Sequence, residues 1–518
     1  MKNLFKALAL VLVLALTITP VMADTDADPN PGNGNTDVVI MNMGSTAADA
    51  TAIYYSTSGN PEYTANTNLA AKGSYRFAAS AATPLGDNWR GSMVVQSAGE
   101  VAAVAEIIWV NGSAADGTTA DAYTGFSAGA TTMYIPYAVY SPNSQFTLFT
   151  VQNTESASAN IRLTFRNRNG GQDLQINDTI PALGSKNYDL RSYQQLQQTT
   201  FWQNNCNVGQ CFWSGAVQVE STNSRKLTAA ATNHWTQWAA AYSGVASGAT
   251  RSYVSSVERR CSDCTWAPYQ GQYGTWQGLS VVTVQCLSTT TACQVQMQFV
   301  GQTATMANLT LPTKTVAPGA AVAASTRAGN DYDQNLFSVL RNSSDPAGQA
   351  FWAGSVIAST TNNTPIAVVA YNQRPNDNIA TGSAGAGAAN AGLSTYIPAA
   401  YKRGVCDGGF NWQRFSIIRI QNPTTNNATD VDIYYYNRNG TLAASELNRT
   451  INAGQALTRH TRVDCSSLAG LGNNWEGSVY IQSNQPLVAV AETYQNAFNN
   501  PSYGASWAAG YNGYSVTP

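Results

Sequence analysis

The decapeptide NWRGSMVVQS at Asn88–Ser97 returns almost unchanged as NWEGSVYIQS at Asn474–Ser483. Two looser copies lie between them, FWSGAVQVES at Phe212–Ser221 and FWAGSVIAST at Phe351–Thr360. Each copy has a tryptophan, a glycine two residues later, and then residues that alternate between the two faces of an extended chain. Alternation with a period of two is typical of a half-buried β-strand. We therefore interpret the chain as four copies of one folding unit.

The tryptophan and the glycine mark equivalent positions in the four copies. The pairs are Trp89 with Gly91, Trp213 with Gly215, Trp352 with Gly354, and Trp475 with Gly477. We expect each tryptophan to cap one end of the core of its unit, because an indole ring buries a large apolar surface. The glycine is expected to let its strand approach the neighbouring strand with no side chain between them. The phrase is thus predicted to be a packing motif rather than a binding site.

The sequence around each copy has the pattern of strands and hairpins. LFTVQNTESASANIRLTFRNRNG at Leu148–Gly170 matches IIRIQNPTTNNATDVDIYYYNRNG at Ile417–Gly440. Such alternating runs are rich in β-branched and aromatic residues and end at Asn, Gly, Ser or Pro. A turn of small residues precedes each tryptophan: AKGS at Ala71, ALGS at Ala182, APGA at Ala317 and NAGQ at Asn452. We predict an all-β fold of four tandem immunoglobulin-like β-sandwich domains.

The repeat sets the expected domain boundaries. We predict a signal peptide at 1–23, a flexible tail at 24–36, sandwich repeats at 37–121, 122–240, 241–379 and 380–510, and a short tail at 511–518. Connectors rich in Gly, Ala and Ser, such as AYTGFSAGATTMYIP at Ala122–Pro136, lead into an extended strand of the next unit. The first unit has no such strand ahead of it, so we expect one edge of its sheet to be open. Four units in tandem are expected to form a rod.

The N-terminus has the features of an export signal. Lys2 and Lys6 flank the start of an apolar run from Leu4 to Ile18, and VMA at Val21–Ala23 supplies small residues for cleavage after Ala23. An N-terminal membrane anchor is the alternative, but the run is short for a membrane span. We expect the mature chain to be secreted, with no membrane span.

Composition excludes some partners and favours others. Of the 518 residues only 11% are charged, and the net charge is −2. Nucleic acid and anionic lipid normally select a basic face, so neither is an expected partner. Asn, Gln, Ser and Thr carry the polarity instead, and we expect a neutral surface rich in hydrogen-bonding groups.

Eight cysteines in an exported chain favour disulfide bonds. They fall into groups of two, four and two: Cys206 and Cys211; Cys261, Cys264, Cys286 and Cys293; Cys406 and Cys465. This grouping indicates pairing within units, with Cys406–Cys465 expected in the last one. Cys286 and Cys293 flank the turn LSTTTA, which suits a bridge across a hairpin. The middle group loosely imitates a zinc site, but the spacing of its second half does not fit one.

Little in the sequence indicates catalysis, and we do not expect an enzyme. The chain has two histidines, His234 and His460, and neither belongs to a known catalytic motif. Glu106 and Glu492 occupy the same position of the repeat, just after AVA, where the middle units have Thr232 and Tyr371. Paired acids can hydrolyse glycosides, but no consistent second acid accompanies them. We interpret the two glutamates as solvated charges at strand ends.

Two loops are candidates for binding. GNDYDQN at Gly329–Asn335 places Asp331 and Asp333 two residues apart, and such oxygen ligands suit Ca²⁺, although an exposed polar loop is the simpler interpretation. WAPYQGQYGTW carries Trp266, Tyr269, Tyr273 and Trp276. Aromatic residues of this kind are enriched where protein chains meet, and they also stack on sugars. We expect contacts with another chain or domain, and carbohydrate binding is the alternative.

Three phrases resemble a known group of proteins: YTGFSAGATTMYIP, VQN followed by NRNG, and NWEGSVYIQSNQPLVAVAE. Over roughly residues 36–510 the layout resembles the tandem immunoglobulin-like repeats of surface proteins from Chloroflexota-type filamentous bacteria. The resemblance implies a component of the cell envelope, extracellular matrix or S-layer, and no catalytic residues. We expect a secreted structural protein that assembles with itself or with other envelope proteins into a lattice, sheath or filament. An adhesin or carbohydrate-binding protein that uses exposed Trp and Tyr loops is the alternative.

Overall fold

The structure is a computed structural model, in which β-strands dominate and the only helices among the described residues are short 3₁₀ turns. It describes residues 9–15, 28–114, 117–141, 144–168, 170, 173–191, 206–207, 210–211, 213–262, 275–343, 351–405, 412–495 and 505–516. The predicted all-β class is therefore confirmed. The strands fall into four sets that follow the sequence repeat, and we call these sets units 1 to 4.

Unit 1 has two four-stranded sheets, in the orders β1-β6-β3-β4 and β5-β2-β7-β8. Its elements are β1 (Ala9–Ala15), β2 (Asn33–Asn42), β3 (Ala48–Ser56), β4 (Pro61–Leu69), β5 (Ser74–Phe77), η1 (Ala79–Ala81), η2 (Thr83–Leu85), β6 (Gly91–Ser97), β7 (Val101–Val110) and β8 (Thr118–Thr124). Strand β1 belongs to the predicted signal peptide and pairs antiparallel with β6. The edge that we expected to be open is thus covered in the full chain.

Units 2 and 3 repeat this pairing, but their lead strands join the two sheets into one. Unit 2 contains β9 (Thr132–Ser141), β10 (Gln145–Asn153), β11 (Ala159–Asn167), β12 (Leu174–Ile180), β13 (Ser185–Asp189), β14 (Cys206–Asn207), β15 (Gln210–Cys211), β16 (Trp213–Ser221), β17 (Leu227–Trp235) and β18 (Ala239–Ser243). Unit 3 contains β19 (Arg251–Ser262), β20 (Thr275–Cys286), β21 (Cys293–Gly301), β22 (Leu309–Thr310), β23 (Lys314–Val316), β24 (Ala321–Ser325), η3 (Gln334–Val339), β25 (Phe351–Thr360), β26 (Ile366–Arg374), η4 (Pro375–Asp377) and β27 (Ile379–Ala384).

Unit 4 follows the short connector of β28 (Ala386–Gly387) and η5 (Ala388–Asn390). Its strands are β29 (Gly392–Gly404), β30 (Trp412–Gln421), β31 (Ala428–Asn437), β32 (Leu442–Ile451), β33 (Ala456–His460), β34 (Asn474–Gln495), β35 (Trp507–Asn512) and β36 (Tyr514–Val516). The predicted boundaries at residues 122, 241 and 380 fall inside β8, β18 and β27, so the AYTG-like phrases that we took for connectors close the preceding unit. The tail expected at 511–518 ends β35 and forms β36, which pairs with β29. The tail expected at 24–36 supplies the start of β2.

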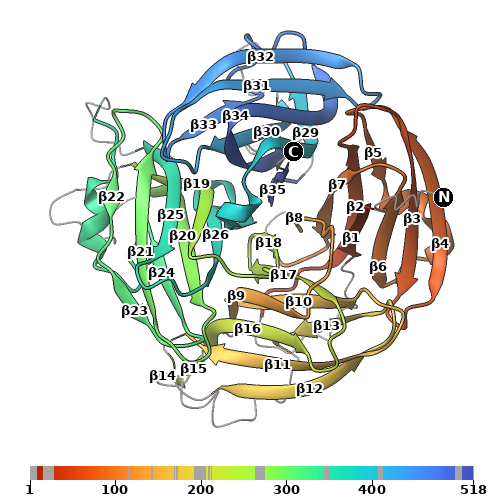
Figure 1. The fold of residues 1–518 in the computed structure, drawn as a ribbon, viewed down its shortest axis with the longest axis horizontal. Coiled ribbons are helices and arrows are strands. Elements are labelled where there is room, and N and C mark those ends of the chain that lie inside the picture. The colour runs from red at the N-terminus through yellow and green to blue at the C-terminus, as the bar shows by residue number, and fades with distance from the viewer. Residues whose placement is uncertain are drawn as a thin grey trace, which may run out of the picture.

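The four units form a closed ring and not the expected rod (Figure 1). Unit 1 lies between unit 4 and unit 2, and the last strand of every unit (β8, β18, β27 and β35) lies at the centre. Hydrogen bonds join these strands: Ser243 Oγ donates to the Thr124 carbonyl at 2.6 Å, Thr124 Oγ1 to the Asn512 carbonyl at 2.5 Å, and Asn512 exchanges two bonds with Ala384. The centre of the ring is therefore a packed column of four strands.

Small residues let the central strands approach one another. Strand register makes Ala122, Ala241, Gly382 and Gly510 equivalent, because each lies opposite the same position of the neighbouring strand. A Cβ atom added to Gly382 would lie 2.3 Å from the Ala241 carbonyl oxygen, and one on Gly510 would lie 3.0 Å from that of Gly382. Side chains larger than these would force the units apart.

The repeated tryptophan and glycine pack against each other in every unit. Trp213, Trp352 and Trp475 are at most 5% exposed, whereas Trp89 is only half-buried. A Cβ atom added to the partner glycine would lie 2.6–2.9 Å from the indole ring and 1.9–2.1 Å from a carbonyl oxygen of the adjacent strand. Glycine is thus required both by the neighbouring strand and by the ring two residues before it.

Candidate functional site

The same joint connects successive units around the ring. One side of the joint is the turn that follows β3 in unit 1, β11 in unit 2 or β31 in unit 4. The other side is the small-residue turn of the next unit around the ring. Ser185 N donates to the Thr57 carbonyl at 3.3 Å between units 1 and 2, and Ala321 N donates to the Arg168 carbonyl at 3.2 Å between units 2 and 3. Ser74 N donates to the Arg438 carbonyl at 3.0 Å between units 4 and 1. Because the last joint repeats the first two, the ring closes with the geometry that connects units consecutive in sequence.

The fourth joint, between units 3 and 4, uses a side chain instead. Ser355 Oγ donates to the Gly454 carbonyl, which lies in the NAGQ turn, at 3.1 Å. The turns AKGS, ALGS, APGA and NAGQ therefore lie where units meet. The sequence shows that these turns recur. It does not show which segment of another unit each turn contacts.

The recurring acid position also lies at these interfaces, and our interpretation of Glu106 and Glu492 as solvated charges is wrong. Glu106 is 7% exposed and Glu492 is 1% exposed. Each contacts the preceding unit of the ring, since Glu106 bonds Tyr401 of unit 4 and Glu492 bonds three residues of unit 3. Tyr371, at the same position in unit 3, accepts a hydrogen bond from Asn233 of unit 2. Only a fold that is already assembled brings these partners together.

Glu106 anchors the closure between units 1 and 4. Tyr401 Oη lies 2.7 and 2.9 Å from its two oxygens, and Arg76 Nη2 forms an ion pair with it at 2.9 Å. Burial alone would raise the pKa of Glu106, but Arg76, Arg414 and the Tyr401 hydrogen bond outweigh it, so the pKa lies below its usual value. Arg76 also pairs with Asp37 at 2.8 Å. The Glu106 carboxylate is thus held as an anion by Tyr401 and Arg76.

A second contact of this closure surrounds Lys72, in the AKGS turn. Its ammonium lies 4.8 and 4.5 Å from the ring centroids of Tyr396 and Tyr480 in unit 4. Tyr396 and Tyr480 stack on each other, with 5.0 Å between their centroids. Ser478 Oγ donates to the Lys72 carbonyl at 2.7 Å. Cation–π contacts of the Lys72 side chain and a hydrogen bond to its backbone carbonyl therefore both stabilise the contact between units 1 and 4.

Glu492 has a corresponding role between units 3 and 4. Its Oε1 accepts hydrogen bonds from Ser256 Oγ at 2.9 Å, Asn372 Nδ2 at 2.7 Å and Thr381 Oγ1 at 3.0 Å, all from unit 3. Burial raises its pKa, but Arg419 and Arg374 together with these bonds lower it further, so the net pKa is depressed. A carboxylate with so many donors is held as an anion.

Units 1 and 2 meet around a buried acid and a histidine. Asp121 is 1% exposed, and Trp109 Nε1 donates to it at 3.3 Å. Burial raises the pKa of Asp121 to about 7, against smaller opposite effects of Thr232 and Trp109. His234 lies with its ring centroid 4.9 Å from those of Trp109 and Phe146, and burial lowers its pKa well below the usual value. This histidine is a neutral part of the core.

His460 is also packed rather than poised for catalysis. It stacks on Phe415 with 4.9 Å between ring centroids, and its Nδ1 accepts from Arg462 N at 3.2 Å. Burial, followed by the charges of Arg374 and Arg462, lowers its pKa to about 3. His460 belongs to unit 4 and His234 to the interface of units 1 and 2, so the fold does not bring the two together.

Asp331 and Asp333 have partners within the chain. Asp331 Oδ2 accepts from Arg168 of unit 2 and from Ala323 N, both at 2.7 Å. Asp333 caps η3 by accepting from Asn335 N at 2.9 Å. Among the residues that the structure describes, no group of three or more His, Cys, Asp or Glu could hold a metal ion. The first aspartate therefore serves the joint of units 2 and 3, and the second serves a 3₁₀ turn.

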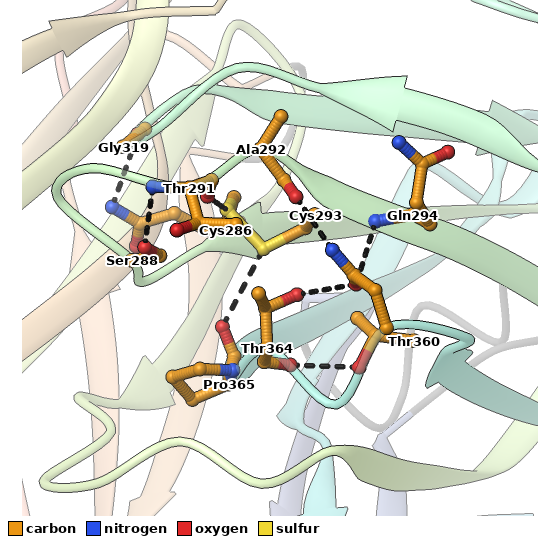
Figure 2. The surroundings of a disulfide bond; sticks show 12 residues. Cys286, Ser288, Thr291, Ala292, Cys293, Gln294, Gly319, Thr360, Thr364 and Pro365 are labelled. Carbon is orange, nitrogen blue, oxygen red and sulfur yellow. Dashed lines mark hydrogen bonds between the residues drawn. A yellow bond between two sulfur atoms is a disulfide. The ribbon is translucent and has the colours of Figure 1, made fainter.

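The bridge predicted between Cys286 and Cys293 is confirmed (Figure 2). It does not cross a hairpin, because β20 and β21 do not pair with each other; it joins the end of β20 to the start of β21 across the turn between them. The turn is held by Ser288 Oγ, which accepts from Thr291 N at 2.9 Å, and Cys293 Sγ lies 3.7 Å from the Pro365 carbonyl oxygen. Cys261 and Cys465 also belong to disulfides. Cys206 and Cys211 are register partners on β14 and β15. Cys264 and Cys406 lie outside the described residues.

Most of the predicted aromatic loop lies outside the described residues, namely Trp266, Tyr269 and Tyr273. Its last member, Trp276, is 4% exposed on β20. The Arg259 and Arg327 guanidinium carbons lie 5.4 and 5.8 Å from its ring centroid. Trp276 is thus a core residue and not an exposed binding residue.

The outer rim of the ring carries the free edges of the sheets (Figure 1). In the described part of the chain, β4 pairs only with β3, β12 only with β11, and β32 only with β31. The rim of unit 3 differs, because β22 and β23 are short and Pro312 lies between them. Two large apolar side chains of β32 point to solvent, Leu442 at 54% and Leu447 at 52% exposure.

Comparison with known proteins gives no family. No protein-family model and no curated protein matches the chain. The match to the "Crystal Structure of Thermotoga maritima 1070" covers 23% of this chain and 94% of that chain, at 18% identity and a TM-score of 0.17. The match to the "Anabaena sensory rhodopsin transducer" covers 20% of this chain and 87% of that chain, at 19% identity and a TM-score of 0.15. A "tetra-tandem repeat in extending region of large adhesion protein" covers 98% of this chain at 14% identity and a TM-score of 0.10. Likenesses this weak support neither a fold assignment nor a function.

Among the helices of the described residues, none has the length and apolar character needed to cross a membrane.

Proposed function

We propose that the chain is a secreted structural protein of the cell surface or extracellular matrix. In this proposal its units are four immunoglobulin-type β-sandwiches, and the closed ring is a rigid building block with no enzymatic role. The blocks join edge to edge into a lattice, sheath or filament. The neutral, hydrogen-bonding composition supports close packing of many copies, because little charge repulsion opposes it.

The observation that carries the proposal is the row of free edge strands on the rim. A free edge presents unpaired backbone N–H and C=O groups, which pair readily with a strand of another chain. Strands β4, β12 and β32 have 9, 7 and 10 residues, long enough for several such bonds. Leu442 and Leu447 add apolar surface to the longest edge. The edge of unit 3, which Pro312 interrupts, makes the rim asymmetric and gives assembly a direction.

The test is electron microscopy of the mature chain, residues 24–518, at increasing concentration. The perturbing variant is Leu442→Lys with Leu447→Lys, because lysines on an edge strand oppose pairing with a second edge. Val463→Lys is the matched control, since Val463 is 68% exposed but lies between β33 and β34, away from the edge strands. All three side chains are exposed, so the ring itself should keep its stability to within about 0.5 kcal/mol.

The proposal predicts ordered sheets, tubes or filaments from the parent and from the control, and markedly less assembly from the double variant, in which only the β32 edge is blocked. Single rings of the parent at every concentration contradict it. Assembly of the double variant to the same extent as the parent contradicts the role of the rim.

A further inference from the structure

Unit 1 contains a cavity that surrounds the one repeated tryptophan left half-exposed. The cavity has a volume of about 710 Å³ and lies where β2 begins and β7 ends, beneath the segment that contains η1 and η2. Trp89 and Tyr54 form its aromatic wall, with 5.9 Å between their ring centroids and a tilt of 68°. Trp89 Nε1 donates to Glu62 at 2.6 Å, which fixes the indole ring. The volume lies within the range of about 300–1,000 Å³ typical of small-molecule sites.

Comparison with units 3 and 4 explains why this cavity exists. In unit 3 the segment before the tryptophan strand buries Phe337, which packs on Phe299 beside Trp352. In unit 4 the same segment buries Leu468 and Leu471 in the core that contains Trp475. In unit 1 the segment has only Leu85 in this role, and Leu85 stays half-buried. Units 3 and 4 thus cover their tryptophan with large buried side chains, which the described segment of unit 1 lacks beside Trp89.

Polar groups line the rest of the cavity. Asp37 is held in place by Arg76 and by Ala79 N, which donates to it at 2.9 Å. Two polar atoms of lining residues are buried and have no hydrogen-bond partner among the described residues, namely Thr36 Oγ1 and Arg90 Nη2. Both atoms are closed off from solvent, so a ligand in the cavity would reach them only if the Thr36 and Arg90 side chains turned. Asn35 is an exposed lining residue, able both to donate and to accept.

We propose that this cavity binds a neutral carbohydrate, with a sugar ring against Trp89 and its hydroxyls on Asn35 and the other exposed polar groups of the wall. Sugar hydroxyls both donate and accept, which matches a wall of amide, hydroxyl and guanidinium groups. Asp37 and Asp87 line the same cavity, and two carboxylates against one lining arginine disfavour an anionic ligand. The site differs from the assembly edge, because no residue of β4 lines the cavity, although Glu62 of that strand holds the Trp89 indole.

The experiment is a glycan array with neutral and acidic oligosaccharides, followed by calorimetry of the mature chain with the best neutral ligand. Trp89→Ala is expected to weaken binding at least about tenfold, as loss of a central tryptophan does in other interfaces. Because Trp89 also contacts Tyr54, Asn35→Ala provides a second variant at an exposed position. It should weaken binding about fivefold, the effect of one lost hydrogen bond. Asn66→Ala, an exposed asparagine on β4 outside the cavity, is the control and should bind as the parent does.

Neutral glycans that bind the parent and the control but not the two cavity variants support the proposal. A silent array, or binding that neither cavity variant weakens, overturns it. Binding of acidic glycans alone overturns the assignment to neutral sugars. Electron microscopy of the same samples scores assembly separately, so the failure of this proposal is distinguishable from that of the structural function.

Discussion

Closure of the ring can be measured as an energetic coupling between two residues that are 295 positions apart in the sequence. The perturbation is a double-mutant cycle of Glu106→Ala in unit 1 and Tyr401→Phe in unit 4. Tyr401→Phe removes two contacts of 2.7 and 2.9 Å to a buried carboxylate. A hydrogen bond to a charged group contributes about 1.5–3 kcal/mol, and the single variant should lose that amount of unfolding free energy.

Glu106→Ala should cost about 3 kcal/mol, the lower end of the range for a broken buried ion pair, because Arg76 keeps Asp37 as a partner. If the two residues touch in solution, the double variant loses less than the sum of the single losses. The expected coupling is about 1–2 kcal/mol, within the range measured for contacting residues. The assay is urea unfolding of the mature chain followed by tryptophan fluorescence.

A matched control cycle pairs Glu106→Ala with Tyr435→Phe. Tyr435 is also a buried tyrosine of unit 4, but its hydroxyl bonds Glu446 and not Glu106. These two changes should add to within about 0.5 kcal/mol. A coupling of Glu106 with Tyr401 no larger than that of the control would refute the closed ring, because an open chain keeps units 1 and 4 apart.

Three further predictions concern single positions. Gly354→Ala should destabilise the protein by about 1–3 kcal/mol in urea unfolding, since the new Cβ would lie 2.1 Å from the Val300 carbonyl oxygen, whereas Gly472→Ala, with no atom within 4 Å, should change little. Asp121 has a folded pKa of about 7, above the value of about 3.9 in an unfolded chain, so its contribution to stability is complete below pH 4 and is lost as the pH rises through 7. Asp121→Asn should therefore melt at a higher temperature than the parent at pH 8.5 and gain less at pH 5, and an equal gain at both would contradict the assignment. Removal of residues 1–23 takes β1 from β6, so amide hydrogens of Gly91–Ser97 should exchange faster in the mature chain than in the full chain, while those of the β16 strand should not change.

The strands could be predicted from the sequence because their signals are local. Alternation along NWEGSVYIQS and its copies reports which face of a strand is buried, and the spacing of tryptophan and glycine reports a close approach of two strands. The bridge of Cys286 and Cys293 was readable for the same reason, since the two residues flank one short turn.

The ring was not predictable in this way, because it depends on contacts between distant segments. Glu106 lies in the middle of β7, and its partner Tyr401 belongs to another unit, so no local pattern indicates their contact. The small-residue turns recur in all four units, and the NRNG phrase recurs in units 2 and 4. Recurring turns indicate a recurring contact, but only the folded chain shows that the contact of the last unit is with the first.

The half-exposure of Trp89 could not be predicted from the repeated phrase either. Its phrase matches that of Trp475 almost residue for residue, and both tryptophans were expected to pack alike. The difference arises outside the phrase, where the segment before unit 1's strand lacks the buried leucines of unit 4. Aligned motifs predict a shared backbone. The length and apolar content of the preceding loop decide whether the indole ring of the tryptophan is covered.

The most direct test of the account is electron microscopy of single particles of the mature chain at a concentration too low for assembly. The closed ring predicts class averages with four lobes around a filled centre and contact between every pair of neighbouring lobes. Linear particles of four beads, or rings open at one position, would contradict it.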